Sequence, residues 1–254
     1  QLADQSHLSK TSIKRIKTYW LSQPPPLMQS SFRERHLVFD GTYFSHVYCL
    51  LIFWDPCRHG VVTTYFCAKE SYFVCVPWFT ALKQQGLHPH SITMDGNTQI
   101  IRAIREVWPG CTIQRCLYHI QRQGLMWLRR YPKSELAREL KHILSLLTFI
   151  KTHSQEEEWW RLYNHWRLQF KEQLRVLDIH NKVDSDIVRT FRMVENAAQD
   201  MFHFLDDRHI PSTSNGAESY FSWLKDHYKK HRGLRKTHLE NYLLWYVYLN
   251  KTQN

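Results

Sequence analysis

Three acidic residues stand in contexts that could bring their carboxylates to one point. Asp40 and Asp95 each end a short apolar run, and each is followed by glycine. Both patterns predict a carboxylate at the end of a strand, beside a turn. Ser214 or Asn215 can cap a following helix that carries Glu218 in its first turn. Three carboxylates make an all-oxygen site, which suits Mg²⁺ or Mn²⁺ better than zinc, so the expected chemistry is that of a metal-dependent nuclease.

Clustered carboxylates need cations for a physical reason. Close negative charges repel one another unless divalent ions neutralise them. Two such ions about 3.5 to 4 Å apart would activate a water or a 3′-hydroxyl and stabilise the leaving oxygen at phosphorus, without a covalent protein intermediate. The sequence contains no Gly-x-x-x-x-Gly-Lys-Ser/Thr loop, so we expect two Mg or Mn ions as cofactors and no bound nucleotide.

The segments around these residues predict an α/β core. Apolar alternation and turn residues predict strands over 36–44, 46–54, 61–68, 91–94 and 111–117, with helices over 70–85 and 99–107. The first three strands read as a meander, and Pro77 would kink the first helix or lie near its start. The order of three strands, helix, strand, helix, strand is that of a ribonuclease-H-like fold. We therefore place the first part of a catalytic domain at 36–120.

Helical spacing dominates the next segment, 121–205, which predicts an all-α insertion. One apolar stripe consists of Leu136, Leu140, Ile143, Leu144 and Leu147, and a second of Trp159, Trp160, Leu162, Tyr163 and Trp166. We expect these side chains to form a small core of their own rather than to stack on bases. Segment 206–254 then returns to the catalytic domain, with helices over 217–225 and 239–249.

The first 23 residues have the layout of a partial helix-turn-helix. Ala3 would lie at the helix crossing, Ser9 would cap the second helix, and Ile13 and Ile16 would face inward. His7 occupies the turn position that usually prefers glycine, and the first helix is incomplete, so we expect the chain to begin partway through the module. The residues left to contact DNA are Lys10, Thr11, Lys14 and Arg15. An ordinary amphipathic helical hairpin is the alternative. Segment 24–35, with three consecutive prolines, is a stiff linker.

Charge and composition favour a nucleic-acid partner. Lysine and arginine exceed aspartate and glutamate by 34 − 23 = 11, which indicates a polyanionic partner. A second basic run consists of Lys229, Lys230, Arg232, Arg235 and Lys236, for which a phosphate-binding role and a solvated face are equally good interpretations. The six cysteines lack the spacing of a disulfide framework, so we expect reduced thiols. No apolar run is long enough to span a bilayer and the polar opening is not a signal peptide, which predicts a cytoplasmic protein without a membrane partner.

Four short motifs in a fixed order resemble those of the DDE transposases of bacterial insertion sequences and their Mutator-like relatives. They are Asp-Gly-Thr-Tyr at 40–43, Asp-Gly-Asn at 95–97, Gln-Arg-Cys-Leu-Tyr-His at 114–119 and Thr-Ser-Asn-Gly-Ala-Glu-Ser at 213–219. The resemblance implies that Asp40, Asp95 and Glu218 are the catalytic and metal-binding triad. It also implies that the 218 − 95 = 123 residues between the last two contain the all-α insertion. An N-terminal DNA-binding module is typical of such transposases.

The resemblance also implies roles for residues near the triad. Cys116 and His119 correspond to the Cys-x-x-His signature of the family, and we favour a structural or DNA-positioning role for His119 over zinc binding and over a plain buried histidine. Asn215 would cap the Glu218 helix and so orient the carboxylate, although a cap without an effect on chemistry is nearly as good an interpretation.

The implied activity is DNA cleavage at the ends of an insertion sequence followed by strand transfer into target DNA, in the bacterial cytoplasm. Joining two element ends implies at least a homodimer. Two alternatives stay open: a nuclease or resolvase of the same fold without strand transfer, and a non-catalytic DNA-binding protein descended from a transposase. Clustered like charges weigh against the second, because a protein that only binds DNA has no use for them.

Overall fold

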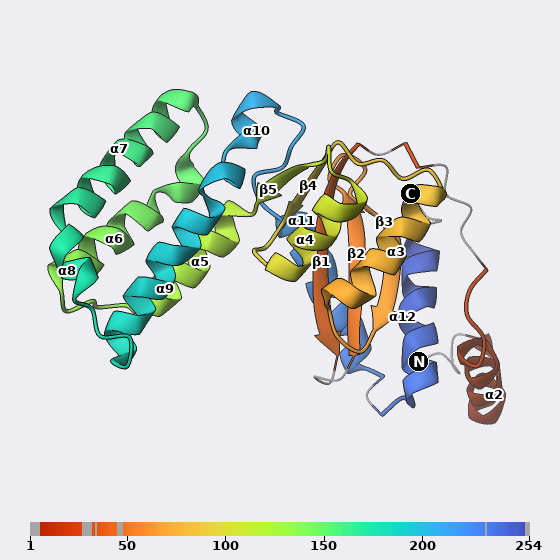
Figure 1. The fold of residues 1–254 in the computed structure, drawn as a ribbon. Helices are drawn as coiled ribbons and strands as arrows, with labels where there is room; N and C mark the ends of the chain where they lie inside the picture. The colour runs from red at the N-terminus through yellow and green to blue at the C-terminus, as the bar shows by residue number, and fades with distance from the viewer. Residues whose placement is uncertain (1–5, 27–31, 34, 45–47, 232, 252–254) are drawn as a thin grey trace.

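A five-stranded mixed sheet in the order β3-β2-β1-β4-β5 forms the centre of the computed structural model, which describes residues 6–26, 32–33, 35–44, 48–231 and 233–251 (Figure 1). The strands are β1 (His36–Phe44), β2 (Tyr48–Asp55), β3 (Gly60–Cys67), β4 (Ser91–Met94) and β5 (Thr112–Arg115). The first three strands form an antiparallel meander, and β4 and β5 run parallel to β1. The predicted α/β class is confirmed, and the sheet is consistent with a ribonuclease-H-like core.

Two pairs of helices cover the two faces of the sheet. Successive side chains of a strand point to opposite faces. Leu37 and Phe39 therefore pack in the cluster of α3 (Tyr72–Gln84) and α4 (Thr98–Val107), while Val38 packs in that of α11 (Asn215–Lys229) and α12 (Lys236–Lys251). Pro77 lies inside α3, as predicted for that helix. Asp40, two residues beyond Val38, shares the face of α11.

The strand register aligns the first two acidic residues of the sequence analysis. In the parallel pair β1–β4, His36 lies opposite Ser91 and Val38 opposite Thr93, so Asp40 and Asp95 are each four residues beyond the first pair. The prediction that Asp40 ends its strand is wrong. Strand β1 continues to Phe44 because its antiparallel pairing with β2 extends past the end of β4. Asp40 is therefore a mid-strand residue, whereas Asp95 directly follows β4.

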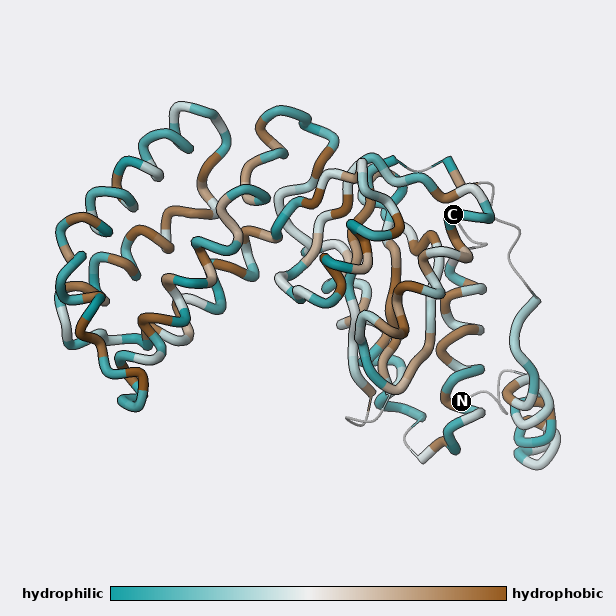
Figure 2. Tube along the Cα trace, in the orientation of Figure 1, coloured by the Kyte–Doolittle hydropathy of each residue, from teal (hydrophilic) through white to brown (hydrophobic). Residues whose placement is uncertain are grey.

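The segment between β5 and α11 is helical and has a hydrophobic cluster of its own. Its helices are α5 (Leu117–Leu128), α6 (Glu135–Ser145), α7 (His153–Gln169), α8 (Lys171–Arg175), α9 (Lys182–Ala197) and α10 (His203–Asp206), with 3₁₀ turns at Leu147–Phe149 and Ala198–Asp200. It extends to one side of the sheet in Figure 1, and hydrophobic residues gather on the facing sides of its helices in Figure 2. Trp159, Tyr163 and Trp166 are buried there, as predicted.

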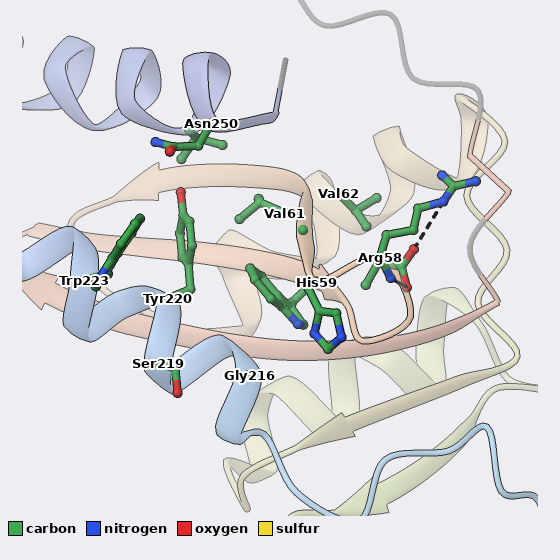
Figure 3. A pocket seen from close by; sticks show the side chains of 13 residues that line it. Arg58, His59, Val61, Val62, Gly216, Ser219, Tyr220, Trp223 and Asn250 are labelled. Atoms are coloured by element: carbon green, nitrogen blue, oxygen red, sulfur yellow. Dashed lines mark hydrogen bonds and ion pairs between the residues drawn. The ribbon is translucent and has the colours of Figure 1, made fainter. Parts of the chain in front are cut away.

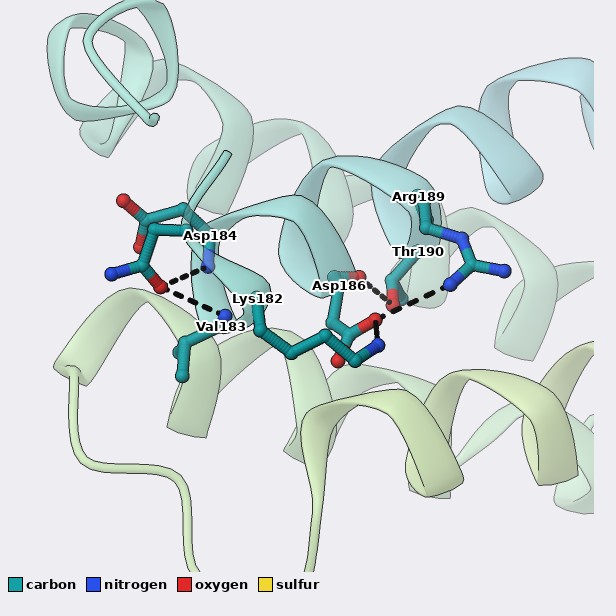
Figure 4. Close-up of polar contacts among 7 residues, drawn as sticks. Lys182, Val183, Asp184, Asp186, Arg189 and Thr190 are labelled. Atoms are coloured by element: carbon teal, nitrogen blue, oxygen red, sulfur yellow. Dashed lines mark hydrogen bonds and ion pairs between the residues drawn. The ribbon is translucent and has the colours of Figure 1, made fainter. Parts of the chain in front are cut away.

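Buried polar groups of this helical segment have partners. The indole nitrogens of Trp159 and Trp166 each donate a 2.9 Å hydrogen bond to a backbone carbonyl of α6. Asp186 is almost fully buried, and its carboxylate accepts hydrogen bonds from Lys182 Nζ at 2.7 Å and Arg189 at 3.4 Å (Figure 4). The hydroxyl of Thr190 donates to the backbone carbonyl of Asp186 at 2.8 Å. These buried polar groups therefore find their partners within the segment itself.

Gln114 joins the helical segment to the sheet. Its buried side-chain amide donates to the carbonyl of Met201 at 2.6 Å and accepts from the amide of Phe204 at 3.2 Å. An ion pair of 3.1 Å between Arg105 and Asp200 lies at the same junction. These contacts hold the end of the segment against β5 and α4.

The N-terminal helix α2 (Lys10–Leu21) packs against α12 by its last turn. Trp20 meets Trp245 edge to face at 5.1 Å, and Asn241 donates to the carbonyl of Leu21. The predicted cap is confirmed, since Ser9 Oγ accepts from the amide of Ser12 at 3.1 Å.

The turn at His7 and the inward-facing isoleucines were the other features expected of this module. His7 adopts a positive φ of 54°, the left-handed conformation that makes glycine the usual choice at that turn. The prediction that Ile16 faces inward is wrong: it is 47% exposed, and the neighbouring Lys17, Trp20 and Leu21 make the contacts of α2 with α12 and the residues before it. Ile13 is half-buried, and Ala3 lies outside the described residues. Among the helices described, none combines the length and apolar character needed to cross a bilayer.

Candidate active site

The carboxylates of Asp40, Asp95 and Glu218 meet at the face of the sheet that α11 covers. Asp40 and Asp95 are brought side by side by the β1–β4 register, and α11 packs on β1 and β2. Glu218 lies in the first turn of α11, as predicted. The structure therefore brings together all three predicted catalytic residues.

Asn215 does not cap this helix. Ser214 holds the N-cap position, and Asn215 is the first residue of the helix and is exposed. The Ser214 hydroxyl makes no capping hydrogen bond to the backbone, because it is turned toward neighbouring side chains instead. The predicted capping role of Asn215 is wrong because Asn215 lies inside the helix, one residue after the N-cap position.

Asp40 has the most strongly perturbed environment of the three. Burial raises its pKa to about 7, and the negative charges of Asp95 and Glu218 contribute to that rise. A hydrogen bond of 2.8 Å from the amide of Gly41 and the nearby His119 act in the opposite direction. Three carboxylates whose charges reach one another offer hard oxygen ligands, a donor set that fits divalent Mg²⁺ or Mn²⁺.

The glycines that follow the two aspartates permit close packing and do not form turns. Neither has a positive φ; Gly41 pairs with Leu51 within the sheet. A Cβ atom on Gly41 would lie 2.7 Å from the Leu51 side chain, and one on Gly96 would lie 2.0 Å from the guanidinium of Arg115. A side chain at either position would therefore force Leu51 or Arg115 to shift.

Arg115 lies behind Asp95 and was not among the predicted site residues. Its side chain is buried, its guanidinium interacts by charge with Asp95 and Asp200, and its Nε has no hydrogen-bond partner among the described residues. Asp95 itself accepts a 2.9 Å hydrogen bond from the amide of Asn97, the residue that caps α4. A buried cation and a helix N-terminus therefore hold the Asp95 loop.

Glu70 is a fourth carboxylate next to the triad. It is half-buried, and Asn97 donates a 3.0 Å hydrogen bond to it. Burial raises its pKa to about 7, and the charges of Asp95 and Asp40 add to the rise. Sequence reasoning missed it because Glu70 precedes α3 without a recognisable motif and reaches the site only through the tertiary fold.

Cys116, His119 and Ser214 form a polar network beside Glu218. The buried Ser214 hydroxyl lies 3.4 Å from Cys116 Sγ, 3.3 Å from His119 Nδ1 and 3.3 Å from Glu218 Oε1. His119 Nε2 lies 3.5 Å from the same Glu218 oxygen. The network connects the Cys-x-x-His residues with the third carboxylate.

The same network shifts the pKa values of the cysteine and the histidine toward an ion pair. A hydrogen bond with Cys116 raises the pKa of His119 to about 9, and the charges of Glu218 and Asp40 contribute. Burial acts to raise the pKa of the Cys116 thiol, but hydrogen bonds from His119 and Ser214 outweigh it and hold that pKa below its usual value. A cationic imidazole next to Glu218 follows at neutral pH.

A tight cluster of metal-type ligands lies elsewhere. Within the described ranges, the one group of three histidine, cysteine, aspartate or glutamate residues whose ligand atoms all lie within 4.8 Å of one another is His36, Asp207 and His209. The catalytic candidates interact by charge over longer distances. Cys116 and His119 belong to no such group among the residues described.

A cavity of about 1160 Å³ lies between α11, the end of α12 and the β2–β3 hairpin (Figure 3). Tyr220 and Trp223 line it from α11, and Trp54 and His59 line it from the sheet. At 3.6 residues per turn, Tyr220 and Trp223 project roughly 140° to 160° around the helix from Glu218. These two side chains therefore point away from Glu218, and Asp40, Asp95 and Glu218 are not among the residues that line the cavity.

The two predicted sets of DNA-contacting residues lie on neighbouring elements. The first set, Lys10, Thr11, Lys14 and Arg15, is exposed on α2. Of the second set, Lys229, Lys230 and Arg235 are exposed, Lys229 forms an ion pair with Asp226, and Arg232 lies outside the described residues. Lys17 contacts His231 at 3.1 Å, which places α2 beside the connection between α11 and α12. The two sets therefore lie on elements that contact each other.

Comparison with known proteins gives one family. The model described as "Transposase, Mutator family" matches residues 58–203, which are more than half of the chain. The matched range includes Asp95, Cys116 and His119 and most of the helical segment. No curated protein matches the chain.

Proposed function

Because the chain belongs to the Mutator family of transposases, and so acts on DNA in transposition and recombination, we propose that it cuts DNA at the ends of a mobile element and joins the freed 3′ ends to a target. The observation that carries this proposal is the alignment of Asp40 on β1 with Asp95 just beyond the parallel strand β4, with Glu218 on the helix that packs on β1. These three residues are the proposed catalytic set.

The carboxylates are arranged to hold cations at a phosphodiester. Asp40, Asp95 and Glu218 would bind two divalent ions, Mg or Mn, which activate the attacking oxygen and stabilise the leaving oxygen. The β1–β4 register places Asp40 beside Asp95, close enough for their carboxylates to interact by charge. Arg115 and the α4 N-terminus fix the Asp95 loop, so the Asp95 carboxylate is already oriented before DNA binds.

His119 and Ser214 position Glu218. His119 is protonated at neutral pH, lies 3.5 Å from the Glu218 carboxylate, and is 30% exposed, so its charge is also available to a DNA phosphate. Ser214 bridges His119 and Glu218. This arrangement supports the structural or DNA-positioning role predicted for His119 over a zinc site at Cys116 and His119.

The basic surface of α2 and of the α11–α12 connection supplies a path for the DNA backbone. Lys229 lies 11 residues beyond Glu218 on the same helix, which corresponds to about 17 Å along its axis. A duplex that reaches the carboxylates can therefore extend along α11 to Lys230, Arg235 and the exposed side chains of α2. Paired element ends would require at least a dimer.

The proposal is tested with Asp40→Asn, Asp95→Asn and Glu218→Gln in the full chain, with Asp226→Asn, an exposed aspartate of α11, as the matched control. Substrates are labelled duplexes carrying the DNA that flanks the coding sequence, with Mg²⁺ or Mn²⁺. Each active-site variant should lose cleavage by at least about 10³-fold, while the control stays near wild type and all four bind DNA. Cleavage that survives all three substitutions would contradict the proposal.

The products separate the proposed transposase from a nuclease. Joined donor–target molecules establish strand transfer, whereas cut ends without joining in the presence of target DNA indicate the ribonuclease-H-like nuclease. Replacing Lys14 and Arg15 by alanine should weaken binding and lower the slope of log K against log salt by roughly one to two. Unchanged binding would exclude α2 from the interface.

A further inference from the structure

His36, Asp207 and His209 form a compact cluster at the end of the sheet where β1 and β4 begin. His36 is the first residue of β1, and the other two lie in the connection between α10 and α11. Their ligand atoms are all within 4.8 Å of one another. Figure 1 places α10 beside this end of the sheet, where a cavity of about 200 Å³ is lined by His36, Asp207 and also His90. Asp40 is four residues further along β1, so the cluster is distinct from the triad.

The ring of His36 is held in one orientation by the sheet. Its Nδ1 lies 3.0 Å from the hydroxyl of Ser91, which is buried, so its Nε2 is directed at Asp207, 3.8 Å away. A metal-binding histidine is commonly held in this way, with one ring nitrogen hydrogen-bonded and the other free to bind. The Ser91 hydroxyl thus supplies the hydrogen bond that orients a metal-binding histidine.

The other two ligands belong to one short turn. Asp207 Oδ1 accepts from the backbone amide of His209 at 2.9 Å and lies 2.9 Å from its ring Nδ1. The rings of His36 and His209 stack at 5.6 Å between centroids. The turn therefore holds a carboxylate and an imidazole together and places both against the imidazole of His36.

We propose that His36, Asp207 and His209 bind a Zn²⁺ ion. Two imidazole nitrogens and one carboxylate oxygen are ligands that zinc prefers and that Mg²⁺ does not. Ligands of a tetrahedral zinc ion lie about 3.3 Å apart, so small side-chain rotations would close the cluster around it. His90, whose ring is 5.6 Å from that of His36, or a water completes the fourth position.

The ion would hold the start of the connection that delivers Glu218. Farther along this connection, the carbonyl of Pro211 accepts from Thr93 at 2.7 Å and that of Ser212 accepts from the amide of Leu117 at 3.0 Å. Zinc at Asp207 and His209 adds an anchor to β1 at the beginning of the same path. The site is structural, and its existence does not depend on the transposition chemistry.

The test measures zinc directly in the purified full chain. The protein is stripped with chelator, dialysed against Zn²⁺ and analysed for bound metal, and Kd is measured by titration with Zn²⁺ alone. His209→Ala and Asp207→Asn remove ligands at partly exposed positions where unfolding is not expected, and His88→Ala replaces an exposed histidine outside the cluster. Asp95→Asn disrupts the catalytic carboxylates instead.

Wild type, His88→Ala and Asp95→Asn should each retain about one zinc per chain with a Tm raised by roughly 5 °C. His209→Ala and Asp207→Asn should bind zinc at least ~10-fold more weakly and lose the Tm increase. Equal zinc affinity in wild type and both ligand variants overturns the proposal, and so does zinc that is lost only in Asp95→Asn, which would assign it to the carboxylates. Neither result affects the cleavage test above.

Discussion

Asp186 in the helical segment and Asp40 in the sheet are both largely withdrawn from solvent, yet their surroundings differ. Asp186 accepts hydrogen bonds from Lys182 and Arg189 (Figure 4). Asp40 has two further carboxylates nearby, and its pKa rises to about 7. A buried charge with partners is compatible with stability, whereas clustered like charges are costly to the fold. The contrast distinguishes a region whose buried charge is compensated by cationic side chains from one whose carboxylates lie near one another.

The same contrast holds for the aromatic residues. Trp159 and Trp166 are buried in the helical segment with their indole nitrogens hydrogen-bonded, whereas Trp223, five residues beyond Glu218, is 64% exposed. In the helical segment, these tryptophans form part of the hydrophobic core. The face of α11 keeps a large ring accessible, beside the cavity of Figure 3.

Trp159→Ala should have the largest effect on stability. The substitution removes a fully packed side chain that stacks on Tyr163 at 5.4 Å, and it should lower the free energy of unfolding by about 3 to 5 kcal/mol. Chemical denaturation measures the change. Trp223→Ala is the matched control and should change stability by less than ~1 kcal/mol. Equal losses would show that the helical core is not the stable region.

Gly96→Ala should be next in size. The new Cβ would collide with the buried Arg115 guanidinium, so the Asp95 loop must shift, at a cost of about 1 to 3 kcal/mol. DNA cleavage should fall with it, because the carboxylate moves. Gly110→Ala, where nothing lies within 4 Å of the added atom, serves as control in both denaturation and cleavage assays. Full activity of Gly96→Ala would contradict the close-packing role.

Asparagine at the two aspartates should change stability in opposite directions. In chelator-treated protein at pH 8, Asp40→Asn should raise the free energy of unfolding by about 1 to 3 kcal/mol, since it removes a charge that burial disfavours. Asp186→Asn should lower it by roughly 1 to 2 kcal/mol, because two ion pairs are weakened. Two changes of the same sign would remove the contrast.

The effect of Asp40→Asn should also depend on pH. The pKa of Asp40 in the folded chain is about 7, above its ordinary value of about 3.9, so the folded state binds the proton more tightly than the unfolded state. The stability of the chelated wild type should therefore fall as pH rises from about 4 to 7. The difference in free energy of unfolding between Asp40→Asn and wild type should grow over that range and level off above pH 7. Thermal melts across pH 4.5 to 8, about the range of the transition, give the profile.

Lys182→Ala should have the smallest effect. Lys182 is 69% exposed and Arg189 still pairs with Asp186 after its removal, so the loss should be about 0.5 to 1 kcal/mol. Denaturation in low and high salt measures it. A loss as large as that of Asp186→Asn would mean that Lys182 alone compensates the buried charge.

The sequence predicted what local patterns encode. Strand alternation identified the strands, helical spacing identified the aromatic core of Trp159, Tyr163 and Trp166, and the short motifs pointed to the carboxylates that the fold brings together. Asp40 was wrongly placed at a strand end because its position depends on pairing with β2, which the motif does not contain. The motifs therefore predicted which aspartates the fold brings together, whereas the turns predicted at the neighbouring glycines were wrong.

Other parts of the site depend on contacts between distant segments. Ser214 reaches Cys116 across 98 residues, and Glu70 reaches Asn97 across 27. Ile16 was wrongly predicted to face inward because helical periodicity cannot tell which end of a helix meets the rest of the protein. Asn215 and Ser214 are equally good caps by residue type, and only the side chains around Ser214 decide between them.

The helical segment leaves the sheet and returns to it at nearly one place. The amide of Leu117, at its beginning, donates to the carbonyl of Ser212, just beyond its end, and Gln114 holds the residues that precede this return. With the two ends joined, a change in the length of the helices between them need not move α11. The intervening helices can therefore differ in length or number while Glu218 keeps its place beside Asp40 and Asp95.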